Sequence, residues 1–198
     1  MSDDVRREFF ERSAPPRTNE VSTAAGVSLA AITVRQAGPE DAAGVAAVLN
    51  GVIAAGSPTL LDTTFTVDEE RAYIESLPAR SFLHVAEAPG AGIVGFQTVI
   101  PWNTFVTSEH DHVATMGTYV DAAHRRQGVG AVLARSSFAA ALALGYDKIF
   151  TDLRADNLDS LAYHLSLGFS IVGAARRHAR VHGRDVDVLF IERFLKEG

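Results

Sequence analysis

The stretch that decides the fold is residues 120–130, Val-Asp-Ala-Ala-His-Arg-Arg-Gln-Gly-Val-Gly. A mostly apolar segment from Val113 to Val120 precedes it and is predicted to be a strand, and an alanine-rich segment that ends near Leu144 follows it with helical periodicity. Gly128 and Gly130 have no side chains, so the backbone N–H groups there can come close to a bound anion. The helix that follows points the positive end of its dipole at the same place. The stretch therefore predicts a diphosphate-binding turn between a strand and a helix.

The apolar patterns on both sides of this turn predict a mixed α/β domain. A capping box is expected at Thr66 and Glu69, where a second helix begins. Strands are expected at 32–35, 82–86, 93–100, 113–120, 149–153, 170–176 and 184–194, and helices at 38–52, 66–77, 129–144 and 157–167. This order, βααβββαβαββ, implies a mixed central sheet of about seven strands with helices on both faces.

The bulk composition limits the function classes. The chain has 198 residues, of which 1–30 are predicted to be an arm or linker and 31–198 a single domain. It has no cysteine, which excludes disulfides, thiolate metal sites and a cysteine nucleophile. The net charge of −6 gives no general nucleic-acid footprint, and no segment approaches the ~20 apolar residues of a membrane span. With an acidic start and no secretory signal, a cytoplasmic protein is expected.

Two glycines in a turn also occur in dinucleotide-binding folds. The dinucleotide fingerprint G-x-G-x-x-G would place its third glycine at Leu133, and too few residues follow Gly130 for a complete fold of that kind. The second motif of this chain favours a different family.

Residues 120–130 resemble the pyrophosphate motif (Q/R)-x-x-G-x-(G/A) of the GCN5-related N-acetyltransferase (GNAT) superfamily. Residues 157–169, Asn-Leu-Asp-Ser-Leu-Ala-Tyr-His-Leu-Ser-Leu-Gly-Phe, resemble the motif that follows the fifth strand of that family. The similarity extends over about residues 32–195. Pro101-Trp102-Asn103 and the two helices after the first strand look most like the phosphinothricin-acetyltransferase-type branch, whose members acetylate small amino-acid-like amines.

The resemblance implies acetyl-CoA as cosubstrate and a GNAT-like fold. Backbone groups of Tyr119 and Val120 would pair with the pantetheine arm, and an N–H group between Thr118 and Val120 would polarise the thioester carbonyl. Backbone N–H groups of the glycine turn would hold the pyrophosphate, with Arg125 and Arg126 adding positive charge. The implied cofactor-binding residues are Thr118, Tyr119, Val120, Arg125, Arg126, Gln127, Gly128, Val129, Gly130, Ala131, Asn157 and Ser160.

The catalytic positions depart from the common family pattern. Many members have a tyrosine four residues before the glycine that ends the last helix, where it protonates the departing thiolate. Here that position is His164, so His164 is the first candidate for this role and the adjacent Tyr163 the second. Relatives of the phosphinothricin type have a glutamate base where this chain has Thr115, so a water relay is expected instead. Trp102 is placed where that branch builds its acceptor pocket, although a core role is equally open.

A histidine-rich stretch and a basic stretch are two further candidate sites. His110-Asp111-His112 offers too few ligands, so no metal is expected. The basic stretch 176–180 could meet a carboxylated substrate or the 3′-phosphate of the cofactor, or could be a solvated hairpin.

The predicted function is direct transfer of acetyl from acetyl-CoA to the primary amine of a small amino-acid-like substrate. Alternatives are a protein N-terminus, lysine, polyamine or aminoglycoside as acceptor, or a sensor that binds acetyl-CoA without turnover. The expected partner is a small-molecule amine, not a nucleic acid or a membrane, and the habit of the family suggests a homodimer.

Overall fold

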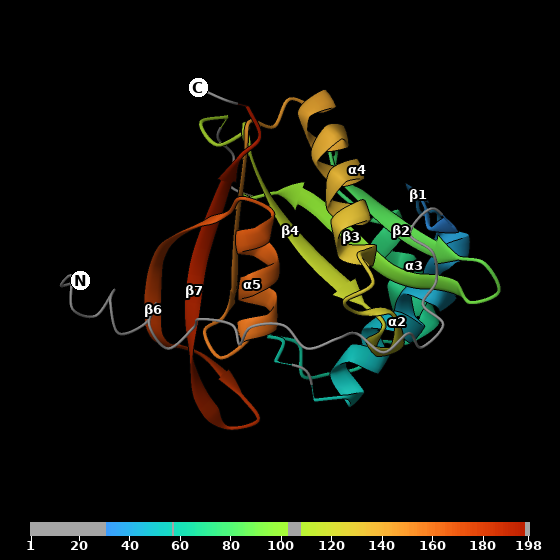
Figure 1. Cartoon of the computed structure of the whole chain (residues 1–198), viewed down its shortest axis with the longest axis horizontal. Coiled ribbons are helices and arrows are strands. Elements are labelled where there is room, and N and C mark those ends of the chain that lie inside the picture. The colour runs from blue at the N-terminus through green and yellow to red at the C-terminus, as the bar shows by residue number, and fades with distance from the viewer. Residues whose placement is uncertain (1–30, 57, 103–107, 197–198) are drawn as a thin grey trace, which may run out of the picture.

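The computed structural model describes residues 31–56, 58–102 and 108–196, which form a sheet with helices on both faces (Figure 1). The predicted arm, residues 1–30, lies outside the described residues. The strands are β1 (Thr33–Gln36), β2 (Phe82–Ala88), β3 (Gly92–Pro101), β4 (Val113–Val120), β5 (Lys148–Arg154), β6 (Ser170–Val181) and β7 (Arg184–Phe194). The α-helices are α2 (Ala42–Ala54), α3 (Val67–Glu75), α4 (Val129–Ala143) and α5 (Leu158–Ser166), with short 3-10 turns at Pro39–Asp41 and Ala122–His124.

The seven strands lie in the order β1-β2-β3-β4-β5-β7-β6. Every neighbouring pair is antiparallel except β4 and β5, which run parallel at the centre of the sheet. The predicted order of elements and the mixed sheet are confirmed.

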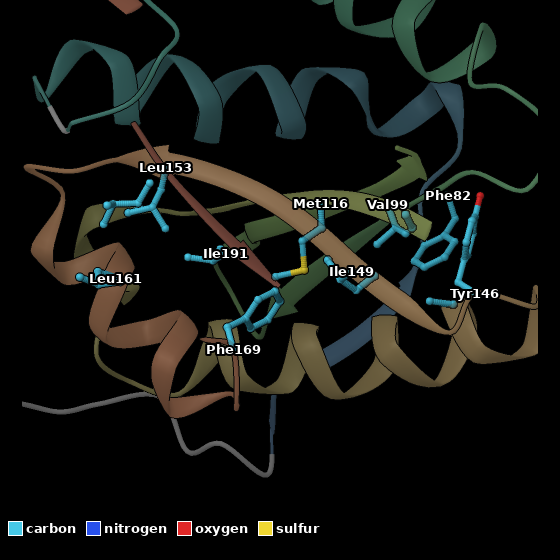
Figure 2. Close-up of a cluster of buried hydrophobic side chains, with 12 residues drawn as sticks. Phe82, Val99, Met116, Tyr146, Ile149, Leu153, Leu161, Phe169 and Ile191 are labelled. Atoms are coloured by element: carbon cyan, nitrogen blue, oxygen red, sulfur yellow. The ribbon is translucent and has the colours of Figure 1, made fainter. Parts of the chain in front are cut away.

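The helices cover the two faces in pairs. Figure 1 shows α4 and α5 in front of the sheet and α2 and α3 behind it. The core in front is made by apolar side chains of α4, α5 and the central strands, among them Met116, Ile149 and Ile191 (Figure 2). Behind the sheet, Val45 and Leu49 of α2 and Ile74 of α3 pack on β2 and β3. Burial of this apolar surface is the main favourable term in folding.

Local sequence signals set several element ends. Thr66 caps α3 and forms a capping box with Glu69, as predicted. The side chain of Asn157 accepts from the backbone N–H of Ser160, so Asn157 is the N-cap of α5 and the helix begins at Leu158. Gly145 ends α4 with a φ of +84°, which a residue with a side chain rarely adopts.

Two boundaries differ most from the predictions. The first helix begins as a 3-10 turn at Pro39–Asp41, and α2 follows only from Ala42. β6 continues to Val181 instead of ending near residue 176, because the β6–β7 turn is formed at His182 and Gly183, both with positive φ. On α4, Val129, Leu133, Ser137 and Ala141 are among the buried residues.

Candidate active site

The central pair of strands, β4 and β5, stop pairing soon after they begin. Only Val113 with Lys148 and Ala114 with Ile149 are paired, although both strands continue for five or more residues. One further contact joins them, the Thr151 hydroxyl donating to the Met116 carbonyl oxygen at 2.9 Å. Beyond it the two strands diverge, and the β4 edge has no ladder partner. We call this stretch, from Gly117 to Val120, the free edge of β4.

The pairing of β4 with β3 decides which backbone groups lie on the free edge. The N–H of Asp121 donates to Val94 and the N–H of Trp102 donates to Val113, so the odd-numbered residues of β4 bond to β3. Because alternate residues of a strand point their N–H and C=O groups to opposite edges, Thr118 and Val120 face the gap toward β5. The expectation for Tyr119 is therefore corrected: its backbone groups pair with Phe96 of β3 and do not face the gap.

The turn after β4 has the backbone geometry of an anion cradle. Arg126 and Gly128 both have left-handed φ angles, +57° and +82°, and Gly128 is the N-cap of α4. The first N–H groups of α4, those of Val129, Gly130 and Ala131, have no acceptor within the helix. They sit at the positive end of its dipole, which favours a bound phosphate.

Two side chains of the turn brace it from within. Arg125 Nε donates to the Val120 carbonyl oxygen at 3.0 Å, and Gln127 Nε2 donates to the Ala123 carbonyl oxygen at 2.7 Å. The Arg126 side chain is exposed. The charge that Arg126 adds beside the turn is therefore accessible to a ligand.

Tyr163 lies against the first turn of α4. Its hydroxyl donates to the Gly130 carbonyl oxygen at 2.9 Å. Burial raises the pKa of Tyr163 to about 12, against smaller lowering effects of hydrogen bonds to Thr118 and Gln97. The phenol is therefore protonated at neutral pH and stands between the turn and the free edge of β4.

Gln97 is a member of this polar group that the sequence analysis did not identify. It is fully buried, and its Nε2 donates to the Thr118 hydroxyl at 2.7 Å. Its Oε1 is buried and accepts no hydrogen bond from the described residues. Buried polar atoms are nearly always satisfied, so this oxygen marks a place for a further donor. A single polar residue in an apolar strand gave only a weak signal in the sequence.

His164 is buried and its ring is engaged on one side. Nδ1 lies 2.7 Å from the carbonyl oxygen of Ser160, and because a carbonyl can only accept, Nδ1 carries the proton. The ring packs edge-on against Phe169 and Tyr163. Burial lowers the pKa of His164, with partial compensation from the bond to Ser160. At neutral pH His164 is therefore a neutral imidazole whose Nε2 has no proton to give.

Asn157 and Ser160 are used within the fold. Besides capping α5, Asn157 donates from Nδ2 to the carbonyl oxygen of Pro58. Arg154 Nη1 lies 3.4 Å from the carbonyl oxygen of Thr59 in the same loop. Both bonds tie the loop between α2 and α3 to the end of β5. The polar atoms of the Asn157 side chain that were expected to reach the cofactor thus serve this junction.

The other face of the sheet carries a row of aromatic rings beside the gap. Phe150 makes an edge contact with Trp102 at 5.5 Å and stacks on Phe190 at 5.9 Å, and Phe190 contacts His178 at 5.7 Å. We call this side, with Trp102, Phe150, Phe190 and His178, the aromatic face. Trp102 is 43% exposed, so it has room to contact a ligand. Thr115 of β4 stands where relatives of the phosphinothricin type have a glutamate base, and a hydroxyl group cannot take that role.

Two classes of feature are not seen in the described part of the chain. No three side chains of His, Asp or Glu come together there as a metal site. No helix in residues 31–56, 58–102 and 108–196 is both long and apolar enough to cross a membrane.

A family model described as the acetyltransferase (GNAT) family matches residues 48–169, more than half of the chain. The chain belongs to this family. Acetyl-CoA is therefore the cosubstrate of this acetyltransferase, as the resemblance implied.

Three similar proteins span nearly the same length. The L-methionine sulfoximine/L-methionine sulfone acetyltransferase of Pseudomonas paraeruginosa is 23% identical over 165 residues, which cover 81% of this chain and 92% of that protein. The L-amino acid N-acyltransferase MnaT of Escherichia coli is 22% identical over 166 residues, covering 84% and 95%. The structure of a GNAT phosphinothricin acetyltransferase from Sinorhizobium meliloti in complex with acetyl-CoA has a TM-score of 0.76 at 21% identity, covering 85% and 90%.

The described residues fit this cosubstrate. The N–H groups of Thr118 and Val120 face the gap in line with the turn, and the N–H groups at the start of α4 lie at its end. Gly130 is required at this point, because a Cβ there would meet the Tyr163 ring at 2.9 Å.

Proposed function

We propose that this acetyltransferase moves the acetyl group of acetyl-CoA to the primary amine of a small amino-acid-like substrate, by direct attack within a ternary complex. The observation that carries the proposal is the free edge of β4, which leads directly into the left-handed turn at Gly128. The acceptor class is supported by the relatives named for L-methionine sulfoximine and L-amino acids, which match over most of this chain.

The cosubstrate supplies an activated acetyl thioester, and the chain supplies its position. We propose that the N–H groups of Thr118 and Val120 bind the pantetheine amides as an added strand would. One of them donates to the thioester carbonyl oxygen, where negative charge develops during attack. The turn from Arg126 to Ala131 holds the pyrophosphate. The chain has no cysteine that could carry an acyl group, which favours direct attack.

The departing thiolate needs a proton, and two adjacent side chains were candidates. His164 was the first choice from the sequence, but its one proton in the neutral form is held by Ser160. Donation from Nε2 would require the imidazolium form, which burial disfavours. Tyr163 keeps its phenolic proton at neutral pH and lies beside Thr118. Its proton is donated to the Gly130 carbonyl oxygen, but rotation of the hydroxyl about the C–O bond can turn that proton to the thiolate, whereas the Nδ1 proton of His164 cannot move to Nε2. We therefore propose Tyr163 as the proton donor and His164 as a residue that holds α5 in place.

Two conservative variants distinguish these roles. Tyr163→Phe should lower kcat by about 100-fold, in the range of one lost acid–base group, with the acetyl-CoA Kd changed far less. His164→Asn can keep a donor near the Ser160 carbonyl and removes Nε2, so it should leave kcat and its pH profile close to those of the parent. If His164→Asn causes the larger loss of kcat and Tyr163→Phe does not, the roles are reversed.

A substrate panel tests the proposed function. Release of the CoA thiol would be followed with L-methionine sulfone, L-methionine sulfoximine and phosphinothricin, and with phenethylamine and spermidine, which have no carboxylate. Faster turnover of the first three is expected. Turnover of only the carboxylate-free amines would overturn the amino-acid-like acceptor, and no turnover of any amine despite binding of acetyl-CoA would overturn the transferase assignment.

Two remaining expectations join the proposal. We propose a homodimer that works in the cytoplasm. Sedimentation analysis at micromolar concentration should then give the mass of two chains, and a monomer mass would contradict it.

A further inference from the structure

Asp152 occupies a position on β5 that the proposed mechanism does not yet use. Extending the β4–β5 register past its last paired residues places Asp152 opposite Gly117, and the Thr151–Met116 hydrogen bond fits the same register. In a parallel pair, opposite residues have side chains on the same face. Asp152 therefore projects on the aromatic face at the point where the strands have separated, one residue from the Thr118 amide.

Aromatic rings border the position of Asp152 on two sides. Gly117 has no side chain, and the Tyr119 ring leans over it, since a Cβ at Gly117 would lie 3.3 Å from that ring. On the other side, Asp152 is the register partner of Phe190, a ring of the aromatic face. Asp152 itself is exposed. A substrate that enters over the aromatic face thus meets the carboxylate beside the thioester position.

The titratable groups near Asp152 belong to β6, β4 and α3. His178 of β6 is close enough to lower the pKa of Asp152, although partial burial raises that pKa more. Burial raises the pKa of Tyr119 on β4, and Tyr73 and Glu70 of α3 and the charge of Asp152 add smaller increases. Arg154, the next residue on this face of β5, is bonded to Asp156. The carboxylate thus has no guanidinium partner in the described structure and is available to an ammonium group.

Glu70 is the other carboxylate of this region, and it is a weaker candidate. It is only 5% exposed, under α3, and burial raises its pKa. An acceptor could not reach it without moving the helix. Asp152, by contrast, is exposed, and it lies on β5, the strand that borders the gap.

We propose that Asp152 binds the ammonium group of the acceptor and removes its proton, so that it is the general base where Thr115 cannot be. The proposal rests on the proposed function. One proton passes from R–NH₃⁺ to the Asp152 carboxylate, and the nitrogen lone pair then forms the N–C bond to the acetyl carbon. The C–S bond breaks and Tyr163 protonates the thiolate. The new amide nitrogen gives up its second proton, which restores the Tyr163 phenol, and Asp152 later returns its proton to solvent.

The test is the pH dependence of kcat/KM in Asp152→Asn. The probe is L-methionine sulfone, or the fastest amine of the panel if that one is not accepted. In the parent, the ionised carboxylate works on the ammonium form, so kcat/KM should be level across neutral pH. In Asp152→Asn only the free amine can react, so kcat/KM should be about 100-fold lower near pH 7 and rise tenfold per pH unit. The deficit should therefore shrink toward the pKa of the amine.

Controls separate a base from a structural residue. Asp152→Glu should recover part of the activity and the level profile. Glu75→Gln, which removes one exposed negative charge on α3, should behave like the parent. Calorimetry should give an unchanged acetyl-CoA Kd for Asp152→Asn but weaker binding of the probe amine to the CoA-bound enzyme. Glu70→Gln should keep the profile of the parent.

The outcomes distinguish this inference from the proposed function. A parent enzyme that acetylates no amine refutes both. An active parent together with an Asp152→Asn variant whose deficit is constant with pH, or absent, refutes the base while the transferase stands. If Glu70→Gln, and not Asp152→Asn, shows a kcat/KM that rises tenfold per pH unit, Glu70 is the base.

Discussion

Replacing Gly130 by alanine tests how Tyr163 and the glycine turn depend on each other. Gly130 is in the first turn of α4 with ordinary helical geometry, so alanine brings no backbone strain. The added Cβ would lie 2.9 Å from Cε2 and 3.2 Å from Cζ of Tyr163. Contacts under 3.0 Å are not tolerated, so the tyrosine ring must move. Its hydrogen bond to the Gly130 carbonyl oxygen, now 2.9 Å, would then be lost.

The expected change in stability is the balance of three terms. Alanine favours a helix over glycine by about 1 kcal/mol. Overpacking costs about 1–3 kcal/mol, and the lost hydrogen bond costs about 1 kcal/mol. The net result should be a destabilisation of about 1–3 kcal/mol. Binding of acetyl-CoA should weaken because the ring that packs on the turn is displaced.

Gly51→Ala provides the matched control. Gly51 lies within α2, and nothing stands within 4 Å of its Cβ position. That change should stabilise the protein by about 0.5–1 kcal/mol through helix propensity alone. Urea unfolding would measure both variants, and calorimetry would give the acetyl-CoA Kd. If Gly130→Ala stabilises as much as Gly51→Ala and binds acetyl-CoA normally, the close packing of Tyr163 on this turn is refuted.

Two further predictions concern the fold. Thr66→Ala removes the capping box of α3 and should cost about 1 kcal/mol, a fall of about 2–4 °C in Tm, whereas Thr64→Ala in the preceding loop should change little. Arg35 lowers the pKa of the Asp41 carboxyl through two hydrogen bonds at 2.7 and 2.8 Å. Asp41→Asn should therefore cost about 1–2 kcal/mol at pH 7. Because the pKa of Asp41 is lowered in the folded state, its stabilisation is complete above the unfolded-state pKa of about 4 and is lost as pH falls toward the folded-state pKa. The cost of Asp41→Asn should therefore fade as pH drops below about 4. A difference between parent and Asp41→Asn in urea unfolding that is unchanged at pH 3 would contradict the assignment.

Local signals in the sequence determined much of this protein. The β4 strand, the turn at Gly128, the capping box at Thr66 and the end of α4 at Gly145 were predicted where the structure has them. Each depends on residues only a few positions apart: a glycine that allows a left-handed turn, a side chain that caps a helix, or apolar residues at a regular spacing. The diphosphate-binding turn followed from the same local pattern, because a diphosphate is recognised by one short stretch of backbone, whereas acetyl-CoA was implied by the resemblance to the GNAT family.

The tertiary structure decided which groups of that pattern face a ligand. Tyr119 was predicted to offer its backbone to the cofactor, but the pairing of β4 with a strand some twenty residues earlier leaves Thr118 and Val120 free instead. His164 appeared to be the acid by its position in a motif, yet burial and the Ser160 carbonyl determine its protonation state. Asp152 carried no signal as a base, since its place opposite Gly117 depends on the register of two strands joined through a helix. The free edge of β4, the protonation state of His164 and the closeness of Asp152 to Gly117 all depend on contacts that form only when the chain folds.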